Sequence, residues 1–546
     1  MTTSTRTRPL ARSLLLLASL MLAAGCEGQG SGGEAARIVL RNTPECLLLA
    51  GGFPPGVDLL PGAPDQAVVA QFVPTAVLGL DLDREPPRLL ATDTVPDFPE
   101  RICPACGGLP LPDSDGDGEA DACQSEAAGF GCLSPTAGSL LAVGPDLAAL
   151  STSSFEQVVL VDPRDGRLRD LVVETPPAGP AFDPADWPFW PAVGAAVART
   201  AFSTRVCVYA DGLVDSLGNP IGPSPFCDPA RNGFVTRFTA GAARVGPRLV
   251  VATSNLVRSS RAQFDPGSVL VFDLDLTTPR PEVRPHASDP VILTTGFNPT
   301  SVTAHTTPAG RRLALVAVSG ALALGTGPDL VRSDSAVDVV DPELGRVIAT
   351  IPLGRAGLGF DRIAIDPTGR LALLGAATSR ALFGIDLAAL DDPSLGHGPG
   401  DDPVVLDGST PGAPDARVFD ASAPFMLPRR ASGAAPDDCT TQTSVAIADS
   451  APRVVASDFC DGSLTVLDLA LPAARTTLLD PGSVLRVDRV QAVAAAIADG
   501  STGRLRAIDR VRLRPGRPGI DWSGPDAYFT AGLPEGAVCG ARIDAL

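Results

Sequence analysis

Short runs of valine, leucine and isoleucine alternate with clusters of glycine, proline, aspartate and asparagine along most of the chain. Long segments with apolar residues at helical spacing are scarce. The 56 glycines and 54 prolines among 546 residues suit many tight turns. This pattern of brief apolar runs between turn residues predicts an all-β fold.

The apolar runs repeat. One unit is a strand-like segment that ends in aspartate and is followed by a turn and another apolar run. Seven aspartates end such segments: Asp81, Asp162, Asp273, Asp341, Asp386, Asp468 and Asp509. A second unit of two strands often precedes the first, at 301–320, 362–377 and 444–459. Two of the spacings, Asp341 to Asp386 and Asp468 to Asp509, are 45 and 41 residues.

A period near 40 residues with about four strands is typical of a β-propeller blade. One such sheet cannot bury both faces until neighbouring sheets stack around an axis. The units resemble the YVTN/NHL-like propeller repeats of bacterial surface and periplasmic proteins, over about residues 70–530. We therefore predict one all-β domain at 37–546, a single β-propeller of about seven four-stranded blades. The alternative is an array of β-sandwiches or two smaller β domains.

Three segments interrupt the predicted repeat. Residues 98–135 are rich in cysteine and aspartate, 176–235 hold two cysteines, and 388–440 are rich in proline, glycine and aspartate. We interpret all three as loop insertions. The 111 residues between Asp162 and Asp273 leave six or eight blades open.

The first 26 residues indicate export. Arg6, Arg8 and Arg12 precede a short apolar run at 13–21, and small residues lead to Cys26. The segment resembles a bacterial lipoprotein signal, which implies removal of residues 1–25 and lipidation of Cys26. Leu22 departs from that pattern, because the leucine usually stands one place nearer the cysteine. A plain cleaved signal or an uncleaved anchor is the alternative, although the run is short for a membrane span.

The residues after Cys26 and the net charge bear on location and partners. Residues 26–36 are glycine-rich and predict a flexible tether. Glu27 follows Cys26, and by the lipoprotein resemblance it favours the outer membrane, with the periplasmic or surface face left open. Removing residues 1–25 takes away three arginines and no acids, so the net charge falls from −19 to −22. Such a charge repels nucleic-acid phosphates, so no nucleic-acid partner is expected.

Ten further cysteines are an even number, which in an exported chain suggests disulfides. Cys207 with Cys227 and Cys439 with Cys460 are natural local pairs. The cluster from Cys103 to Cys132 has room for two bridges, and that leaves Cys46 and Cys539, one near each end of the domain. A Cys46–Cys539 bridge would bring the two ends together and secure the closure of the propeller ring. The disulfide candidates are Cys46, Cys103, Cys106, Cys123, Cys132, Cys207, Cys227, Cys439, Cys460 and Cys539.

The sharpest local motif begins at Asp113, in the string DSDGDGEADAC. Oxygen ligands at alternating positions with glycine at the sixth are what a Ca²⁺ loop needs. The string resembles a thrombospondin type-3 calcium repeat; the flanking residues do not suggest the helices of an EF-hand. We predict a structural calcium site, with a solvated acidic turn as the alternative. The predicted ligands are Asp113, Asp115, Asp117, Glu119 and Asp121.

Catalytic signals are weak. The three histidines, His286, His305 and His397, lie in unrelated contexts without metal-ligand spacing. Lactonase-like propellers use carboxylates and asparagines around a central divalent metal, and four residues lie near strand edges that could face such an axis. They are Asn255, Asn298, Asp361 and Asp449, for which turn roles are preferred. Among the aromatic residues, we expect Trp187, Phe189 and Trp190 to pack in the interior.

From these features we predict a lipid-anchored binding or scaffold protein of the cell envelope that is noncatalytic. It would reach the membrane through its lipid and present loops to a protein or polysaccharide partner. The alternatives are a propeller enzyme of the metal-dependent lactonase or lyase type, or an accessory subunit of an envelope complex. The side chains that line the central channel are the observation that separates them.

Overall fold

The computed structural model covers the chain. Within it, the structure describes residues 45–48, 56–71, 76–83, 87–90, 137–152, 156–176, 178–179, 182–188, 190, 196–209, 211–224, 226–257, 263–322, 331–379, 381–396, 402–407, 418–419, 425–426, 444–448, 453–458, 463–470, 486–493, 507–513, 527–532 and 537–541. No helix in these ranges is long and apolar enough to cross a membrane.

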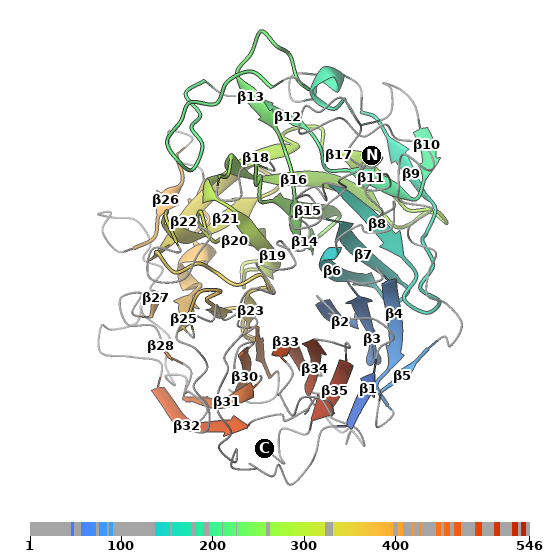
Figure 1. Cartoon of the computed structure of the whole chain (residues 1–546), viewed down its shortest axis with the longest axis vertical. Coiled ribbons are helices and arrows are strands. Elements are labelled where there is room, and N and C mark those ends of the chain that lie inside the picture. The colour runs from blue at the N-terminus through green and yellow to red at the C-terminus, as the bar shows by residue number, and fades with distance from the viewer. Residues whose placement is uncertain are drawn as a thin grey trace, which may run out of the picture.

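Small antiparallel sheets stand around a central axis, as Figure 1 shows. The first strand of each sheet lies innermost. These strands are β2 (Gly56–Leu60), β6 (Ala137–Gly144), β14 (Thr239–Val245), β19 (Pro299–Thr306), β23 (Ala364–Ile365), β29 (Val445–Ile447) and β33 (Ala507–Leu513). Contacts run from β33 through β2, β6 and β14 to β19, and from β23 through β29 back to β33. The gap between β19 and β23 is bridged by hydrogen bonds, one of them from Ile363 N to Thr303 Oγ1 at 2.8 Å. The ring is therefore closed, and the β-propeller prediction is confirmed.

The outer strands in the first half of the chain complete three sheets. Next to β2 lie β3 (Ala63–Gln71), β4 (Ala76–Asp81) and β5 (Arg88–Leu89). Next to β6 lie β7 (Leu147–Thr152), β8 (Gln157–Val161) and β11 (Ala201–Ser203). Next to β14 lie β15 (Arg248–Thr253), β16 (Pro266–Asp275), β17 (Glu282–Pro285), β9 (Leu171–Glu174) and β10 (Ala196–Arg199), with β18 (Val291–Phe297) also on β16.

The outer strands in the second half of the chain complete three further sheets. Next to β19 lie β20 (Arg312–Val318), β21 (Ser335–Asp341), β22 (Arg346–Gly354) and β26 (Val404–Val405). Next to β23 lie β24 (Leu371–Gly375), β25 (Ala381–Asp386), β27 (Val418–Phe419) and β28 (Phe425–Met426). Next to β29 lie β30 (Arg453–Asp458), β31 (Ser463–Ala470) and β32 (Arg486–Val493). Outside the ring sheets lie the hairpin β12 (Cys207–Tyr209) with β13 (Gly233–Val235) and the 3₁₀ turns η2 (Pro184–Asp186) and η4 (Ala388–Asp391).

The β-propeller is confirmed, but the prediction of about seven four-stranded blades is wrong. In the described ranges, only the sheets that begin at β2, β6, β29 and β33 have four strands. Those at β19 and β23 have five strands, and the one at β14 has seven. Part of the excess comes from long connections that add strands in parallel, β9 against β17 and β26 against β22. A backbone edge offers free N–H and C=O groups to any passing segment, and these connections use it.

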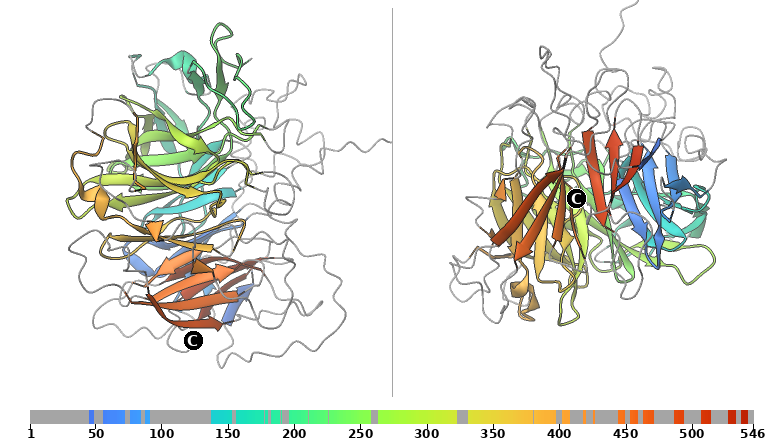
Figure 2. Two further views of the ribbon diagram at one scale, coloured as in Figure 1. Left: turned by 90° about the vertical axis from the view of Figure 1, so that its left-hand side faces the viewer. Right: turned by 90° about the horizontal axis from the view of Figure 1, so that it is seen from below.

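The last sheet joins both ends of the folded chain. Strands β33, β34 (Ala527–Gly532) and β35 (Ala537–Ala541) are followed by β1 (Glu45–Leu48), which pairs with β35. Figure 2 shows β1 in blue beside the red C-terminal strands. In this register Cys46 lies opposite Cys539. Cys539 is disulfide-bonded and fully buried. The Cys46–Cys539 bridge stays a prediction, which this register supports.

The recurring aspartate has a local physical cause. Asp81, Asp162, Asp341 and Asp386 each lie at or just after the end of the third strand of a sheet. The Oδ1 atom of each accepts a hydrogen bond from the backbone N–H two residues later, at 2.9–3.0 Å. Such a bond mimics a backbone turn and satisfies an N–H that the strand no longer pairs. The repeat in the sequence is therefore a repeat of turns.

Two of the seven aspartates were misplaced. Asp273 lies inside β16, and it is Asp275 that accepts the bond from the N–H of Thr277, at 2.8 Å. Asp509 lies on β33, which is an innermost strand and not a third strand.

Apolar layers fill the spaces between adjacent sheets. Strands such as β8, β15 and β24 are buried at every position, because each of their faces meets another sheet. Burial of one large aliphatic side chain contributes about 1.5–3 kcal/mol. Beside η2, Trp187 and Trp190 are 3% and 8% exposed. The ring of Trp190 stacks on Phe272 with centroids 5.7 Å apart. The predicted burial of Trp187 and Trp190 is confirmed; Phe189 lies outside the described residues.

Candidate functional site

A cavity of about 330 Å³ lies on the axis of the ring. It is lined by five innermost strands, β2, β6, β14, β19 and β33, and by residues 360–362, which lead into β23. Small residues let these strands approach closely. A Cβ atom on Gly241 of β14 would lie 2.6 Å from the Cα of Ser301 on β19. No real side chain tolerates that distance, so glycine is required where β14 and β19 meet.

The charged side chains of this cavity are mostly cationic. Arg244, Arg362, Arg510 and Arg512 line it together with one carboxylate, Asp361. A second carboxylate, Asp58 on β2, is bonded to Arg362. We call these four arginines and two aspartates the axial charge cluster. The whole chain carries −19.

Asp361 is the anionic centre of the cluster. Its two oxygens accept a bidentate pair of hydrogen bonds from Arg512, at 2.7 and 2.8 Å. Arg510 approaches the same carboxylate to 3.8 Å, and the hydroxyl of Ser444 donates to it. These partners come from β33 and from the residue before β29. Asp361 therefore ties three sheets together.

The electrostatics of Asp361 follow from these partners. Burial alone would raise the pKa of its carboxyl group, but the positive charges of Arg512 and Arg510 outweigh this effect. The pKa is held well below its ordinary value. Asp361 is therefore ionised throughout the neutral range, and its charge is matched by arginine.

Asp58 and Arg362 form a second tie, which crosses the axis. Asp58 lies on β2 and Arg362 lies just before β23, and their sheets are not neighbours in the ring. The other carboxylate oxygen of Asp58 accepts the N–H of Ala142 on β6, at 2.9 Å. One carboxylate thus links strands of three sheets.

Arg244 differs from the other three arginines. Its Nη1 donates to the carbonyl of Val143 at 3.0 Å, and its Nε donates to the carbonyl of Gly246 at 3.1 Å. No carboxylate in the described part of the chain forms an ion pair with it. Its residue is exposed, so the guanidinium is held in place but keeps its charge uncompensated.

Ser301 adds a neutral polar group. It lines the cavity from β19 and is 3% exposed. Its Oγ has no hydrogen-bond partner among the residues that the structure describes. A buried hydroxyl without a partner costs free energy, so a water or ligand oxygen in the cavity would stabilise it.

The four residues that were considered as axis residues do not all line the cavity. Asp361 does line the cavity, whereas Asn255 and Asn298 do not. Both asparagines have a positive φ of 56° and bond to nearby backbone, so their preferred turn roles are confirmed. Asp449 lies outside the described residues. No group of three or more metal-ligating side chains occurs within the described ranges.

The histidines have structural environments where they are described. His286 lies 2.9 Å from Asp273 through Nδ1. His305 is buried on β19, and burial lowers its pKa. His397 lies outside the described residues. The arginines of the cluster escaped sequence analysis, because all 43 basic residues of the chain are arginine and none stood out. The alternation of Arg510 and Arg512 on one strand is the signal that could have found them.

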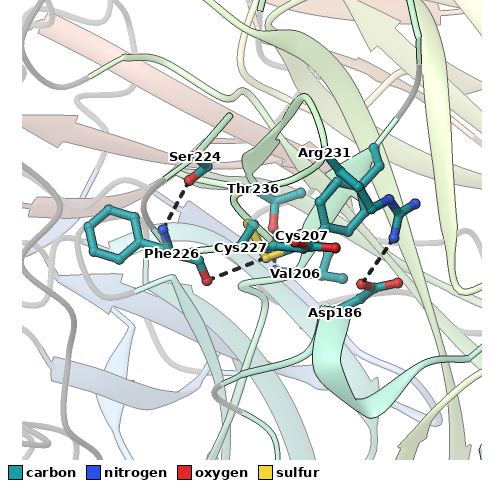
Figure 3. The surroundings of a disulfide bond; sticks show 10 residues. Asp186, Val206, Cys207, Ser224, Phe226, Cys227, Arg231 and Thr236 are labelled. Atoms are coloured by element: carbon teal, nitrogen blue, oxygen red, sulfur yellow. Dashed lines mark hydrogen bonds and ion pairs between the residues drawn. A yellow bond between two sulfur atoms is a disulfide. The ribbon is translucent and has the colours of Figure 1, made fainter. Parts of the chain in front are cut away.

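The Cys207–Cys227 disulfide is confirmed, with Cα atoms 5.8 Å apart. Figure 3 shows it beneath Arg231, which lies 3.9 Å from Asp186. The guanidinium of Arg231 also covers the ring of Tyr209 at 3.6 Å. The bridge joins the first residue of β12 to the segment that precedes β13.

Most of the other predicted sites lie outside the described residues. These are the lipidation site Cys26, the calcium ligands Asp113, Asp115, Asp117, Glu119 and Asp121, and the cysteines Cys103, Cys106, Cys123, Cys132, Cys439 and Cys460.

Comparisons with known proteins add little detail. No family model matches the chain, and no curated protein is similar to it in sequence. Among solved structures it is similar to hydrazine synthase of Kuenenia stuttgartiensis, with 12% identity, TM-score 0.46 and coverage of 95% of this chain and 100% of that one. The β-propeller domain of Cps50 (Swd1) of Myceliophteria thermophila gives 12% identity and TM-score 0.41, over 90% and 98% of the two chains. Virginiamycin B lyase of Staphylococcus aureus gives 6% and 0.37, over 91% and 98%. At such values these likenesses carry no argument about function.

Proposed function

We propose that this protein is a noncatalytic binding scaffold of the cell envelope, anchored by a lipid on Cys26. The observation that carries the proposal is that both carboxylates of the axial charge cluster are used as ties between sheets. Asp361 joins three sheets, and Asp58 joins three through Arg362 and the N–H of Ala142. A ring held in this way suits a rigid support for surface loops.

The same observation weighs against the alternative of a metal-dependent lactonase or lyase. Such an enzyme needs axial carboxylates that are free to coordinate a cation. Asp361 instead receives a bidentate arginine, and the guanidinium of Arg362 occupies one oxygen of Asp58. Arginine charges at hydrogen-bond distance from these carboxylate oxygens would also repel a divalent ion. We therefore do not advance the enzyme as a second candidate.

The location is proposed from the sequence. The basic start, the short apolar run and Cys26 support export and lipidation, and Glu27 supports the outer membrane. A diacylglyceryl group with an N-acyl chain gives enough apolar burial for stable attachment. The partner would be a protein or a polysaccharide of the envelope.

The anchor is tested by palmitate labelling and membrane fractionation of cells that express the chain. Wild-type protein should be labelled and found with membranes, and Cys26→Ser should be unlabelled and leave them. Cys539→Ser is a control that changes another cysteine and should keep the label. Label that survives Cys26→Ser contradicts the anchor.

The scaffold role is tested by chemical crosslinking in intact cells. Discrete adducts that contain this chain and an envelope component are the expected result. A chain that stays monomeric at every crosslinker concentration, while labelled at its anchor, contradicts the scaffold.

The structural calcium site is tested by calorimetry. The wild-type chain should bind Ca²⁺, and Asp115→Ala with Asp117→Ala should abolish the heat because two carboxylate ligands are removed. Asp165→Ala, an exposed aspartate in another turn, is the control. Equal heats in wild type and double variant contradict the assignment.

A further inference from the structure

We propose that the outer edge of β10 binds an extended protein segment that carries a carboxylate and an apolar residue at alternate positions. The segment would add one strand to the sheet. The inference deepens the proposed scaffold function and rests on it, because it names where on the ring a protein partner binds and in what conformation. Figure 1 shows β10 at the outer margin of the ring, in the sheet that begins at β14.

The backbone of β10 has a free edge. Within the described residues only β9 pairs with this strand, and Ala198 lies opposite Val172 in that pairing. The N–H of Val172 donates to the carbonyl of Pro281 at 2.8 Å, on the side of β9 that faces β17. Opposite residues of an antiparallel pair either bond to each other or both turn their backbone groups away. The N–H and C=O of Ala198 therefore face outward, and those of Ala196 do so as well by the two-residue period.

The edge lacks the features that commonly protect one. Folded proteins block free edges with lysine, proline or a bulge. The sequence of β10 is Ala-Val-Ala-Arg, and its register with β9 has no shift. Ala196 and Ala198 are exposed, and their small side chains leave room for another strand. Main-chain hydrogen bonds supply the affinity when a peptide adds to a sheet in this way.

Arg199 gives the edge a chemical preference. It lies opposite Leu171 and Val197 lies opposite Val173, so both share a face with two buried residues of the core. The Nε of Arg199 is buried and has no hydrogen-bond partner in the part of the chain that the structure describes. Burial lowers its pKa, and no described carboxylate opposes this. A poorly solvated cation without a partner costs free energy, which a carboxylate would offset.

The pairing geometry defines the partner. In an added strand, the residue opposite Arg199 points to the same face, with its Cβ atom about 4.5–5.5 Å away. A carboxylate at that position can reach the guanidinium, because Arg199 is partly exposed. Two residues along, an apolar side chain opposite Val197 would extend the apolar layer. A second copy of β10 would bring another Arg199 instead of a carboxylate, so the charge favours a different chain.

The probe is a fluorescently labelled, capped heptapeptide, TVTDTVT, and anisotropy measures its binding to the purified full chain in detergent. Saturable binding is expected. The peptide TVTNTVT should bind roughly 2- to 5-fold more weakly, because an opposite-charge cross-strand pair is lost. TVTDTVT that is N-methylated throughout cannot form the main-chain bonds and should not bind. No saturable binding of TVTDTVT, or equal binding of its methylated form, overturns the proposal.

Variants locate the site. Ala198→Pro removes an outward N–H, which an edge strand tolerates, so the protein should fold and lose peptide binding. Arg199→Gln should lower the affinity for TVTDTVT to that for TVTNTVT. Arg167→Gln, whose side chain is 73% exposed in an outer turn, removes the same charge elsewhere and should bind both peptides as wild type does. Binding by a folded Ala198→Pro protein contradicts the edge, and unchanged affinity in Arg199→Gln contradicts the charge contact.

Circular dichroism shows whether Ala198→Pro folds; if it does not, the methylated peptide tests the edge without any variant. Analytical ultracentrifugation tests the other occupant. A wild-type dimer that Ala198→Pro dissociates would show that a second copy occupies the edge, and would overturn the assignment. Failure of peptide binding leaves the crosslinking and labelling results of the scaffold untouched. Peptide binding without crosslinked adducts contradicts the scaffold alone, so the two proposals fail separately.

Discussion

Asp361 in the axial cavity and Asp265, the residue before β16, are both buried aspartates beside arginine. Their pKa values nevertheless shift in opposite directions. Asp361 has a bidentate partner at 2.7 and 2.8 Å and a second arginine at 3.8 Å. Asp265 has one arginine, Arg237, at 3.6 Å. Burial raises the pKa of Asp265 to about 6, the charge of Arg237 opposes this only in part, and the negative charge of Asp215 adds to it.

The difference teaches that burial beside a cation does not by itself keep a carboxylate ionised. Direct hydrogen bonds and a second positive charge decide the outcome at Asp361. At Asp265 the neighbouring Asp215 takes the stabilising contacts instead, from Asn219 at 2.9 Å and Gln263 at 2.6 Å. Asp361 is an ionic tie between three sheets, whereas Asp265 is a buried carboxyl group that has only an indirect contact with one arginine and lies near the charge of Asp215.

The largest expected effect is from Asp361→Asn. It leaves the charges of Arg510 and Arg512 without their carboxylate, so the free energy of unfolding should fall by about 3–5 kcal/mol at pH 7. Urea denaturation measures it. Asp165→Asn, whose ion pair with Arg167 is solvent-exposed, should change stability by less than about 1 kcal/mol.

The lowered pKa of Asp361 predicts how the free energy of unfolding changes with pH. Its folded pKa is lowered, so its contribution is fully present above the unfolded value of 3.8 and is lost as the pH falls through the folded pKa. Wild type should therefore lose stability in strong acid, and Asp361→Asn should lose less. Equal acid slopes in the two proteins contradict the assigned partners.

A smaller effect is expected from opening the Cys207–Cys227 disulfide. With a sequence separation of 20, the bridge contributes about 3 kcal/mol by its constraint on the unfolded chain. In the double variant Cys207→Ser and Cys227→Ser, hydrogen exchange should increase at β12 and β13 and stay slow at β15. Uniformly faster exchange throughout the ring would show that the two regions are not separable.

Asp265→Asn should stabilise the protein by about 1–3 kcal/mol at pH 7, from the raised pKa of about 6. The unfolded carboxyl ionises near 3.8 and the folded one near 6, so wild-type stability falls as the pH rises from about 4 to 6. The variant lacks this slope, and the two proteins should be equally stable near pH 4. Denaturation at a series of pH values measures the difference. A destabilised variant at pH 7 would show that the Arg237 pair dominates.

The smallest effect is expected from Asp338→Asn on β21. Asp338 is wholly buried and accepts two bonds from Thr295, at 2.7 Å each. Burial raises its pKa, and the bonds from Thr295 offset this only in part. An asparagine amide can keep both contacts, so stability at pH 7 should change by less than about 1 kcal/mol, in the stabilising direction. A thermal melt measures it; a large loss would show that the charge of Asp338 is needed.

The sequence predicted the fold class because the turn chemistry is local. An aspartate that accepts an N–H two residues later can be recognised in the sequence at the end of an apolar run, as Asp81, Asp341 and Asp386 can. Strands that long connections add in parallel, such as β9 and β26, have no such local signal in the sequence. Their pairing depends on where a distant edge lies, which no local pattern encodes.

The candidate site was less predictable. Asp361 was selected as a residue near the axis, but its ion-pair partner Arg512 lies 151 residues away. Asp58 and Arg362 are separated by 304 residues. Contacts of this kind exist only after the ring closes. In a chain whose basic residues are all arginine, no compositional signal marks the few that line the cavity.

The central claim is that the sheets form one ring tied across its axis, and a double-mutant cycle between Asp58→Asn and Arg362→Gln tests it most directly. The free energies of unfolding of both single variants and the double variant give the coupling between positions 304 residues apart. The account predicts a coupling of roughly 1–3 kcal/mol, because the two side chains bond directly. Additive effects, with no coupling beyond error, would contradict it.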